Sequence, residues 1–371
     1  MSCRVSLVIF EGGKTGDPLV KDMMAVRKQV VLDSIEKVSS VPQIHEVVVA
    51  TNFEDLALEV RAMGATVELT GTSGFHFGQR LRDVITRHGM EAVIYMGGAS
   101  APLISADDLK QVAAGLSEGR SVVYSNNLQS ADIIAFRPAS AIQDIDPPGA
   151  DNLLGWLLRE AGLELKALPG SARFHFDIDT PTDLVILSLQ PDTGPRAKRE
   201  LERLNWPPDR VARARDRLSI PMSEIVLIGR VGPRIVTFIN DHFQCRLRVF
   251  SEERGMKALG RDTRGEVVSL LGLFLDEHGP EELFRYIGRI GHAAFIDSRV
   301  MMAHGGRTVS DHDRYNSDLG RSALIADPRV RSFTEAAMGC PIPVVLGGHS
   351  VVNGGLRLLA ENLLEGSPCP A

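Results

Sequence analysis

The first 190 residues alternate between short apolar runs and longer segments in which apolar residues recur at helical spacing. Continuous apolar runs are typical of strands in a parallel sheet that is covered on both faces. Strands are expected at 5–10, 46–51, 65–69, 92–96, 121–124, 132–136 and 173–178, and helices at 26–38, 53–63, within 74–88, from 105, and at 153–161. Strands that alternate with helices predict a doubly wound, mostly parallel α/β sheet.

A second alternating pattern begins at Glu224. Strands are expected at 225–228, 245–250, 293–296 and 342–346, and helices at 235–243, 267–278, 281–290 and 356–364. The pattern predicts a smaller three-layer α/β domain over 222–371, after a first domain at 1–190. Residues 191–221 are rich in arginine, lysine and glutamate and contain Pro207-Pro208, which indicates a charged linker with one or two solvated helices.

The composition of the chain argues against two classes of function, the binding of nucleic acid and the binding of an anionic membrane. The chain has 371 residues, a formal net charge of −6 and 44% hydrophobic residues. A net negative charge gives no electrostatic case for binding nucleic acid or an anionic membrane. The four cysteines are scattered without zinc-like spacing, and the first residues show no signal-peptide pattern. We therefore expect a cytoplasmic protein, while a monomer and a homo-oligomer both stay open.

The stretch from Phe174 to Leu184 carries two carboxylates, Asp177 and Asp179, followed by a Thr-Pro helix start. If this stretch is a strand, the two carboxylates share one face. Carboxylates at a strand end are hard oxygen ligands suited to magnesium and its bound phosphates. A surface strand end followed by a capped helix is the plain alternative.

Two glycine-bearing loops follow predicted strands. The loop 11–17 contains Gly12, Gly13 and Lys14, and the loop 97–103 begins at Gly97. Glycine lets backbone N–H groups approach phosphates, and lysine adds positive charge. The first loop lacks the P-loop pattern, and ordinary turns have the same composition.

These segments together resemble the nucleotidyltransferase domains of the molybdenum-cofactor guanylyltransferase-like (MobA-like) and 2-phospho-lactate guanylyltransferase group. The resemblance covers the first 190 residues and rests on the loop 11–16, on Lys21 with the helix after it, on 101–109, and on the closing Asp-x-Asp-Thr-Pro-x-Asp-Leu segment at 177–184. It implies a nucleotide-diphospho-sugar transferase-like fold.

The resemblance also implies an activity. A nucleoside monophosphate would move from a nucleoside triphosphate to a small acceptor, with a phosphorylated acceptor favoured and Mg²⁺ as cofactor. The implied catalytic residues are Lys14, Lys21 and Asp179, and the implied metal ligands are Asp177 and Asp179. The implied nucleotide-binding residues are Gly12, Gly13, Lys14, Gly97 and Ser100.

Two departures from the family pattern matter. Asp17 and Pro18 stand where the family has an arginine, and Ser100 stands where it has a metal-binding aspartate. Asp17 or Asp132 are candidates to replace the missing carboxylate. The alternative is a catalytically degenerate protein that binds a nucleotide or sugar nucleotide, whose C-terminal domain carries the activity or an assembly role. A glycosyltransferase on the same kind of sheet is a weaker third option.

The second half matches no family that we recognise. Histidine and carboxylate side chains concentrate in an apparently loop-like stretch, 297–318, and a further histidine, His349, follows the glycine pair at 347–348. Such side chains bind metals or exchange protons, although polar loops are common without either role. The candidate second site comprises Asp297, His304, Asp311, Asp313 and His349. Four basic residues form a further candidate grip for a phosphorylated ligand: Arg254, Lys257, Arg261 and Arg264.

Overall fold

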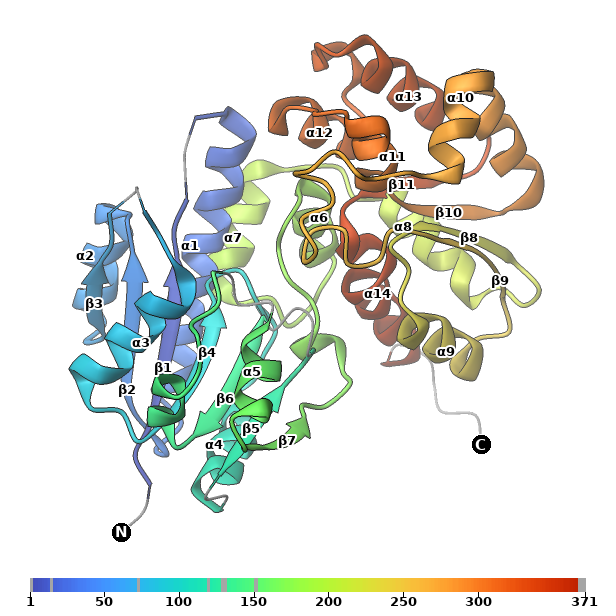
Figure 1. Cartoon of the computed structure of the whole chain (residues 1–371). Coiled ribbons are helices and arrows are strands. Elements are labelled where there is room, and N and C mark those ends of the chain that lie inside the picture. Colours follow the sequence, from blue (N-terminus) through green and yellow to red (C-terminus); the bar gives the residue numbers. More distant parts are fainter. Residues whose placement is uncertain are drawn as a thin grey trace, which may run out of the picture. The chain divides into compact units, whose positions relative to one another are not determined.

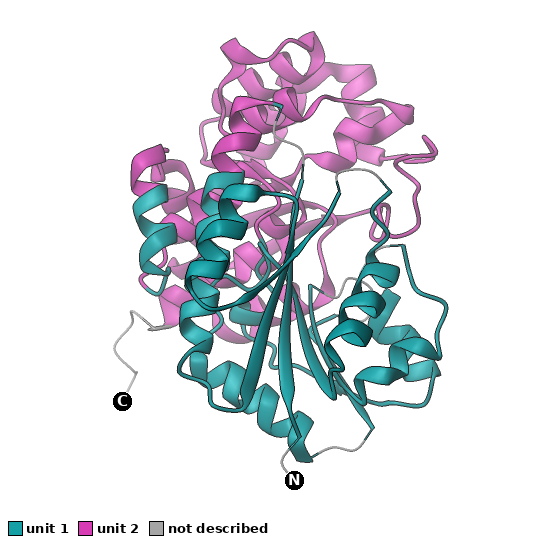
Figure 2. Ribbon diagram, turned by 90° about the vertical axis from the view of Figure 1, so that its left-hand side faces the viewer, with its two compact units in different colours: residues 1–16, 24–177, 192–200 teal, residues 17–23, 178–191, 201–371 magenta. Residues whose placement is uncertain are grey.

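The computed structural model describes residues 3–13, 16–71, 74–118, 121–127, 132–149 and 153–365 (Figure 1). Chain contacts divide it into two compact units (Figure 2). The first unit comprises residues 1–16, 24–177 and 192–200, and the second comprises 17–23, 178–191 and 201–371. The main change of unit thus falls between Asp177 and Ile178, whereas the sequence pattern placed the end of the first domain at residue 190.

The first unit contains a seven-stranded sheet in the order β3-β2-β1-β4-β6-β5-β7. All neighbouring strands are parallel except β6, which runs antiparallel to β4 and β5. The strands are β1 (Val5–Glu11), β2 (Ile44–Thr51), β3 (Thr66–Leu69), β4 (Ala92–Gly97), β5 (Val122–Ser125), β6 (Ile133–Arg137) and β7 (Glu164–Ala167). The predicted doubly wound, mostly parallel sheet is confirmed.

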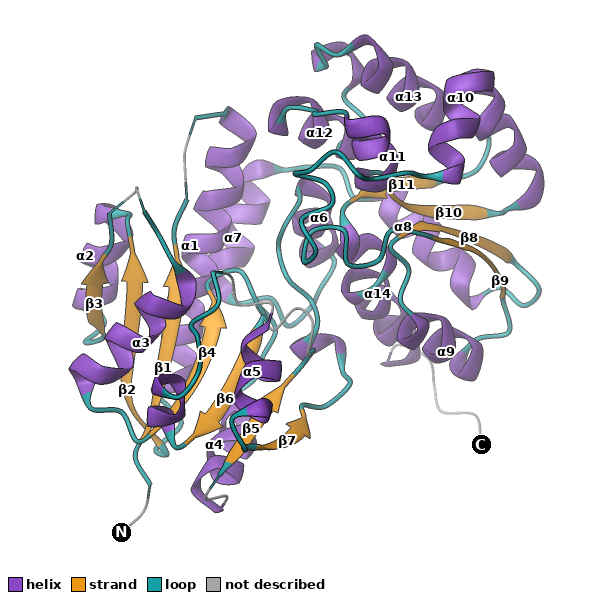
Figure 3. Cartoon of the chain, viewed as in Figure 1, coloured by secondary structure: helices purple, strands orange, loops and turns teal. Residues whose placement is uncertain are grey.

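Helices cover both faces of this sheet (Figure 3). One face packs against α3 (Phe77–His88) and α5 (Leu154–Glu160), in a core that includes Leu81 and Phe136. The helix α4 (Ala106–Glu118) contacts β1 and β6, and α2 (Glu54–Ala62) contacts β2 and β3. The long helix α1 (Pro18–Val38) follows the first glycine loop and spans a change of unit at residue 24.

The strand predicted at 173–178 is wrong. This segment forms a short 3₁₀ turn, η3 (Ala172–Phe174), followed by a single bridge in which Asp177 pairs antiparallel with Ser100. Phe174, Phe176 and Ile178 are all buried, so their alternation reflects packing of side chains from a turn and the residues after it, and not a strand. The pattern also missed β7, whose residues are intermediate or exposed.

The second unit contains a four-stranded, all-parallel sheet in the order β11-β10-β8-β9. Its strands are β8 (Glu224–Gly229), β9 (Arg246–Ser251), β10 (Ala293–Asp297) and β11 (Val344–Gly347). One face packs against α10 (Leu270–Ile290) and α13 (Pro328–Met338). The helices α8 (Asp209–Asp216), α9 (Pro233–His242) and α14 (Gly354–Glu365) lie on the other side (Figure 3). The predicted second α/β unit is confirmed.

The two helices predicted on either side of Gly279 are confirmed, because the segment α10 is broken by a non-helical backbone at Gly279. Two other local predictions for this unit need correction. Helix α8 is not a solvated linker helix, because Val211 and Ala214 are buried and the helix contacts β10, β11 and α14. The stretch 297–318 is not a loop, because it contains α11 (Arg299–Ala303) and α12 (Asp311–Asp318).

The remaining helices are short. They are α6 (Pro181–Ser188), which begins at the Thr-Pro turn, and α7 (Pro195–Leu204). A capping box starts α6, in which Thr180 and Asp183 bond each other's backbone as the sequence pattern predicts. Among the residues described, none of the helices has the length and apolarity required to cross a membrane.

Candidate functional site

Parts of three of the four resemblance segments meet at the carboxyl ends of β1 and β4 in the first unit, the last of them through Asp177 alone. Gly12 and Gly13 directly follow β1, and Gly97 ends β4 in register with Phe10. Beyond β4, Ser100 is buried and bridges Asp177, while the Ala101 N–H donates to the Phe176 carbonyl at 3.0 Å. In open α/β sheets ligands bind at this edge. The first unit therefore has a candidate ligand site made from loops far apart in sequence.

Asn52, which follows β2, fastens the first glycine loop. Its Oδ1 accepts from the Gly13 N–H at 3.0 Å, and its Nδ2 donates to the Gly13 carbonyl at 3.0 Å. A Cβ at Gly12 would lie 2.6 Å from the same Oδ1. The glycine at position 12 is thus needed for this close approach, and Asn52 fixes the backbone at Gly13.

A buried ion pair that we did not single out from the sequence supports the same edge. Glu11, the last residue of β1, is 1% exposed, and Arg27 of α1 donates to its Oε2 from Nη2 at 3.2 Å. Burial raises the pKa of Glu11, and Arg27 opposes that rise. A Cβ at Gly98 would lie within 2.6 Å of the Glu11 Cβ, so glycine is required where this loop crosses the carboxylate. The sequence did contain a signal for this ion pair, because Glu11 is a charged residue at the end of an apolar run.

The other predicted residues of the nucleotide site are distributed as follows. Lys14 lies outside the described residues. Lys21 is exposed on α1 and belongs to the second unit. Asp177 belongs to the first unit, whereas the exposed Asp179 belongs to the second. The shared strand face that was expected for these two carboxylates is wrong, because no strand forms at 174–180.

The two carboxylates proposed to replace the missing family aspartate have partners other than Ser100. Asp17 belongs to the second unit, where its Oδ2 lies 2.6 Å from Nδ1 of His312. Asp132 accepts a hydrogen bond from Asn126 at 3.3 Å. Within the described part of the chain, no group of three or more histidine, cysteine or acidic side chains is arranged to hold a metal ion.

The second unit has its own cluster at the carboxyl edge of its sheet. Asp297 ends β10 and is fully buried, and Arg230, directly after β8, donates to both of its carboxylate oxygens at 2.5 and 3.1 Å. Burial alone raises the pKa of Asp297, but Arg230 outweighs it, and the pKa lies below its ordinary value. His349, two residues beyond β11, interacts electrostatically with this pair. The sequence predicted Asp297 and His349 and missed Arg230.

A second buried ion pair, between Arg299 and Asp318, lies just beyond the carboxyl end of β10. Arg299 donates to both carboxylate oxygens of Asp318, at 2.9 and 2.5 Å. Burial raises the pKa of Asp318 against the opposing charge of Arg299. Burial acts to lower the pKa of Arg299, but the charge of Asp318 outweighs it and the pKa of Arg299 is raised. The bidentate geometry favours the ion pair, because two parallel N–H donors match an ionised carboxylate. Both residues lie in the stretch singled out from the sequence.

The structure does not bring His304, Asp311 or Asp313 into this cluster. The Nδ1 of His304 accepts from the Ser269 N–H at 3.0 Å. Asp311 is exposed and pairs with Arg314 one helical turn away. Asp313 accepts from the backbone N–H groups of Ala326 and Asp327 at 2.7 and 3.2 Å. These contacts fasten helix ends and loops.

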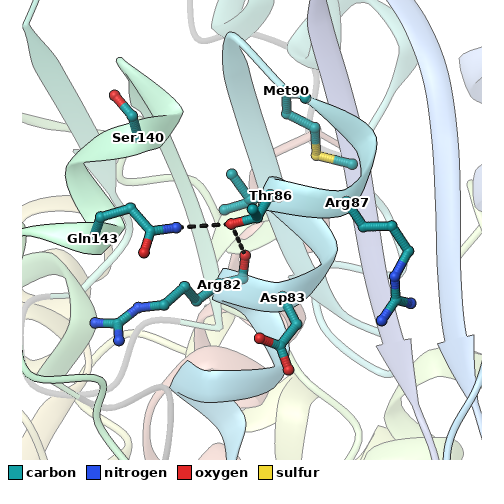
Figure 4. A pocket seen from close by; sticks show the side chains of 9 residues that line it. Arg82, Asp83, Thr86, Arg87, Met90, Ser140 and Gln143 are labelled. Carbon is teal, nitrogen blue, oxygen red and sulfur yellow. Dashed lines mark hydrogen bonds between the residues drawn. The ribbon is translucent and has the colours of Figure 1, made fainter.

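An open cavity of about 850 Å³ lies elsewhere in the first unit, between α3 and η1 (Ala139–Gln143). Figure 4 shows side chains that line it, including Arg82, Thr86 and Gln143. The Nε2 of Gln143 donates a hydrogen bond to the Thr86 hydroxyl at 2.7 Å. Its lining includes Gly89 and Met90, which precede β4, so it opens at the amino end of that strand. It is therefore separate from the loops described above.

No protein-family model matches the sequence, and no curated protein matches it. Solved structures that resemble the chain include a nucleotidyl transferase from Methanothermobacter thermautotroptrophicus, with 16% identity and a TM-score of 0.42 over 54% of this chain and 99% of that one. A cytidylyltransferase from Leptospira borgpetersenii has 15% identity and a TM-score of 0.40 over 54% and 94%. CMP:2-keto-3-deoxy-manno-octonic acid synthetase, complexed with CTP, has 17% identity and a TM-score of 0.37 over 49% and 95%. Each similarity spans about half of this chain.

Proposed function

We propose that the first unit binds a nucleoside triphosphate and transfers its nucleoside monophosphate to a small, phosphorylated acceptor. One observation carries this proposal. In the first unit, the bridge between Ser100 and Asp177 joins the first residue of the closing Asp-x-Asp segment to the chain beyond β4, whose end pairs with the end of β1. Parts of segments that resemble one family in sequence thus lie at the edge where such sheets bind ligands, which supports the proposal.

The roles follow from position. Backbone groups at Gly12 and Gly97 would face the phosphates, because neither residue carries a side chain to keep them away. An oxygen of the acceptor attacks the α-phosphorus, and the bond to the departing pyrophosphate breaks in line. Lys14 and Lys21 would offset the negative charge that develops, as the resemblance implies.

Magnesium is the cofactor that the resemblance implies, and the residues at this edge are compatible with it. Mg²⁺ in phosphate-handling proteins uses one or two carboxylates and takes its other ligands from water and substrate phosphates. Asp177, whose backbone bridges Ser100, is one candidate carboxylate of the first unit, and the resemblance implies Asp179 as a second candidate. Bound magnesium would stabilise negative charge on the phosphates.

Ser100 favours a second candidate function in the same unit. A hydroxyl is a weaker magnesium ligand than a carboxylate, and Asn52 already occupies the Gly13 amide. A degenerate relative would bind a nucleotide or sugar nucleotide at this edge without releasing pyrophosphate. The C-terminal unit would then carry the activity or the contacts for assembly.

Calorimetric titration with each nucleoside triphosphate, with and without magnesium, tests both versions. We expect one triphosphate to bind only with magnesium, and Asp177→Asn to weaken that binding at least tenfold, since a charged metal ligand is lost. Asp107→Asn removes an exposed carboxylate of the same unit and is the matched control, expected to have no effect. Asp179→Ala tests the second candidate ligand, and unchanged affinity removes Asp179 from the site.

Pyrophosphate release then separates the two functions. Release that depends on a phosphorylated acceptor supports transfer. Magnesium-dependent binding without release supports the degenerate binder. Absence of binding by every triphosphate contradicts transfer, and absence of binding by sugar nucleotides as well contradicts the degenerate binder.

A further inference from the structure

We propose that the second unit binds a second copy of this chain through β9, so that the two copies of this strand pair antiparallel about Val249. This inference concerns an interaction surface and does not depend on nucleotidyl transfer in the first unit. It rests on four features of the described residues: the open backbone edge of β9, the covered edge opposite it, the exposed apolar side chains around β9, and the fit of the strand with itself.

The backbone of β9 is open on one side. β9 is the last strand of its sheet, and β8 is its only strand neighbour in the part of the chain that the structure describes (Figure 3). The N–H groups of Arg246 and Glu252 both donate to backbone carbonyls on the β8 side, at 2.7 and 3.1 Å. Backbone groups alternate in direction along a strand, so the N–H and C=O groups of the odd-numbered residues between these two point away from β8. Such a row of unpaired groups is a template for pairing with another strand.

The opposite edge of the same sheet is covered. All residues of β11 are buried, and the helices α6, α8 and α12 contact this strand. The Thr182 hydroxyl donates to the Leu346 carbonyl of β11 at 2.7 Å, so a side chain satisfies a backbone group of that edge. Proteins commonly cover sheet edges or keep them short, because an unpaired edge attracts further strands. β9 has six residues, two more than either end strand of the first sheet, and its exposure is the exception within its own sheet.

Exposed apolar side chains lie on the open strand itself. Val249 and Phe250 are 38% and 41% exposed, and as consecutive residues of a strand they lie on opposite faces of the sheet. Single exposed apolar residues are common, whereas a contiguous group of them indicates an interaction surface. Both faces of β9 therefore expose apolar area at the open edge.

Further exposed apolar side chains continue this group at both ends of β9. At the amino end, the N–H of the exposed Met222 donates to the Gln244 carbonyl at 2.9 Å. At the carboxyl end, Glu252 accepts from the N–H of the exposed Leu270 at 2.8 Å, and the next residue accepts from the N–H of the exposed Val268 at 3.2 Å. The β9 surface thus comprises Met222, Val249, Phe250, Val268 and Leu270.

The sequence of β9 favours one register for pairing with its own copy. Side chains directly opposite each other in an antiparallel pair share a face, and like charges in such positions are destabilising. Pairing about Arg248 would set this arginine against its own copy. Pairing about Val249 instead sets two valines against each other, with Leu247 opposite Ser251 of the second copy. The register about Val249 is therefore the favoured one.

The same register makes the charges of the two copies complementary. Arg246 and Arg248 share a single carboxylate within the unit, Glu224 of β8, at 3.8 and 3.2 Å. Glu252 has no ion-pair partner among the described residues, and in this register it lies opposite Arg246 of the second copy. Arg248 lies opposite Phe250 of the second copy, where a guanidinium is attracted to the face of an aromatic ring. A twofold axis repeats both contacts.

The apolar residues beyond β9 enlarge the contact. A stable interface buries about 1,200–2,000 Å² of surface, so side chains outside the strand have to contribute. Antiparallel pairing places the amino end of one β9 beside the carboxyl end of the other. Met222 of one copy therefore approaches Val268 and Leu270 of the second, and apolar side chains cover each other at both ends of the paired strands.

The test is analytical ultracentrifugation of the full-length protein over a range of concentrations, where we expect a dimer. Val249→Lys should raise the dissociation constant of this dimer about tenfold or more, because two lysines then meet at the twofold axis. Leu69→Lys is the matched control, since Leu69 is an exposed apolar residue on β3, an end strand of the other sheet. It should leave the dimer unchanged. Circular dichroism checks that each variant is folded.

A charge exchange tests the register. Arg246→Glu and Glu252→Arg should each weaken the dimer about fivefold, because like charges then face each other, and the double variant should restore it. A monomer at every concentration, a dimer that Val249→Lys leaves intact, or equal weakening by Leu69→Lys overturns the proposal. Failure of the double variant to restore the dimer overturns the pairing about Val249.

Discussion

The carboxyl edges of the two sheets occupy the same topological place and are built in different ways. In the first unit the edge consists of glycine loops, a buried serine, the single bridge from Ser100 to Asp177 and one ion pair, Glu11 with Arg27. In the second unit it consists of two buried bidentate pairs, Arg230 with Asp297 and Arg299 with Asp318. One edge is made mainly of backbone and the other of charged side chains.

The difference teaches how each edge can recognise a ligand. Backbone loops offer N–H groups that suit phosphates and need no charge of their own. Forming a buried ion pair costs desolvation free energy, and the attraction between the two charges offsets that cost only while their geometry stays intact. The second edge should therefore be the more rigid of the two and the more sensitive to loss of one charge.

The largest expected effect comes from a substitution that removes one charge of a buried pair in the second unit. Arg230→Leu leaves the carboxylate of Asp297 buried without its cation, and this should lower the free energy of unfolding by about 3–5 kcal/mol. Urea denaturation followed by circular dichroism measures the change. Lys110→Ala, which removes an exposed partner of Asp107, should cost less than about 1 kcal/mol.

A double variant shows whether the cost arises from the unpaired charge. In an Asp297→Asn background, Arg230→Leu should cost clearly less than in the wild-type chain, because no buried carboxylate remains. Equal costs in both backgrounds would mean that Arg230 stabilises the unit by packing alone.

The second prediction concerns the backbone-built edge. Gly98→Ala places a methyl group against the buried Glu11, within 2.6 Å of its Cβ, so the loop after β4 must shift. Such overpacking should cost about 1–3 kcal/mol and weaken triphosphate binding. Thermal denaturation and titration measure the two effects. Gly71→Ala, where the methyl group meets open space, is the control, and a similar loss there would mean that the contact with Glu11 is not the cause.

The smallest expected effect is a pH dependence in the second unit. The folded-state pKa of His349 is about 4, below the ordinary value of 6.5. As the pH falls from 6.5 towards 4, the unfolded chain therefore takes up this proton before the folded chain does, and stability decreases. His349→Gln should flatten the curve of unfolding free energy against pH within this window. Parallel curves for the variant and the wild-type chain would show that the ring titrates alike in both states.

The sequence located most strands correctly, because short continuous apolar runs such as 92–96, bounded by polar or glycine residues, are typical of strands buried on both faces. It failed at 173–178, where the alternate burial of Phe174, Phe176 and Ile178 has the period of a strand. A hydrophobic pattern reports which side chains are buried, whereas a strand also requires a partner for its backbone. The structure supplies that partner for only one residue pair, Ser100 and Asp177.

The prediction of a loop at 297–318 was wrong for the opposite reason. Its density of charged residues indicates a solvated loop, but Asp297, Arg299 and Asp318 are buried in helices and a strand end because each has an ion-pair partner. Burial of a charge depends on a partner that is distant in sequence. Arg230, 67 residues before Asp297, could not be assigned from local pattern.

The sequence by itself determined two alternating α/β patterns, the glycine loops that follow their strands, and the capped start of α6, because these depend on near neighbours along the chain. Only the tertiary structure decided which loops meet. It joined Ser100 to Asp177, Arg230 to Asp297, and the Gly347-Gly348 pair to the start of α6. These contacts depend on strand order, which is fixed by how the buried faces of all strands and helices pack at once.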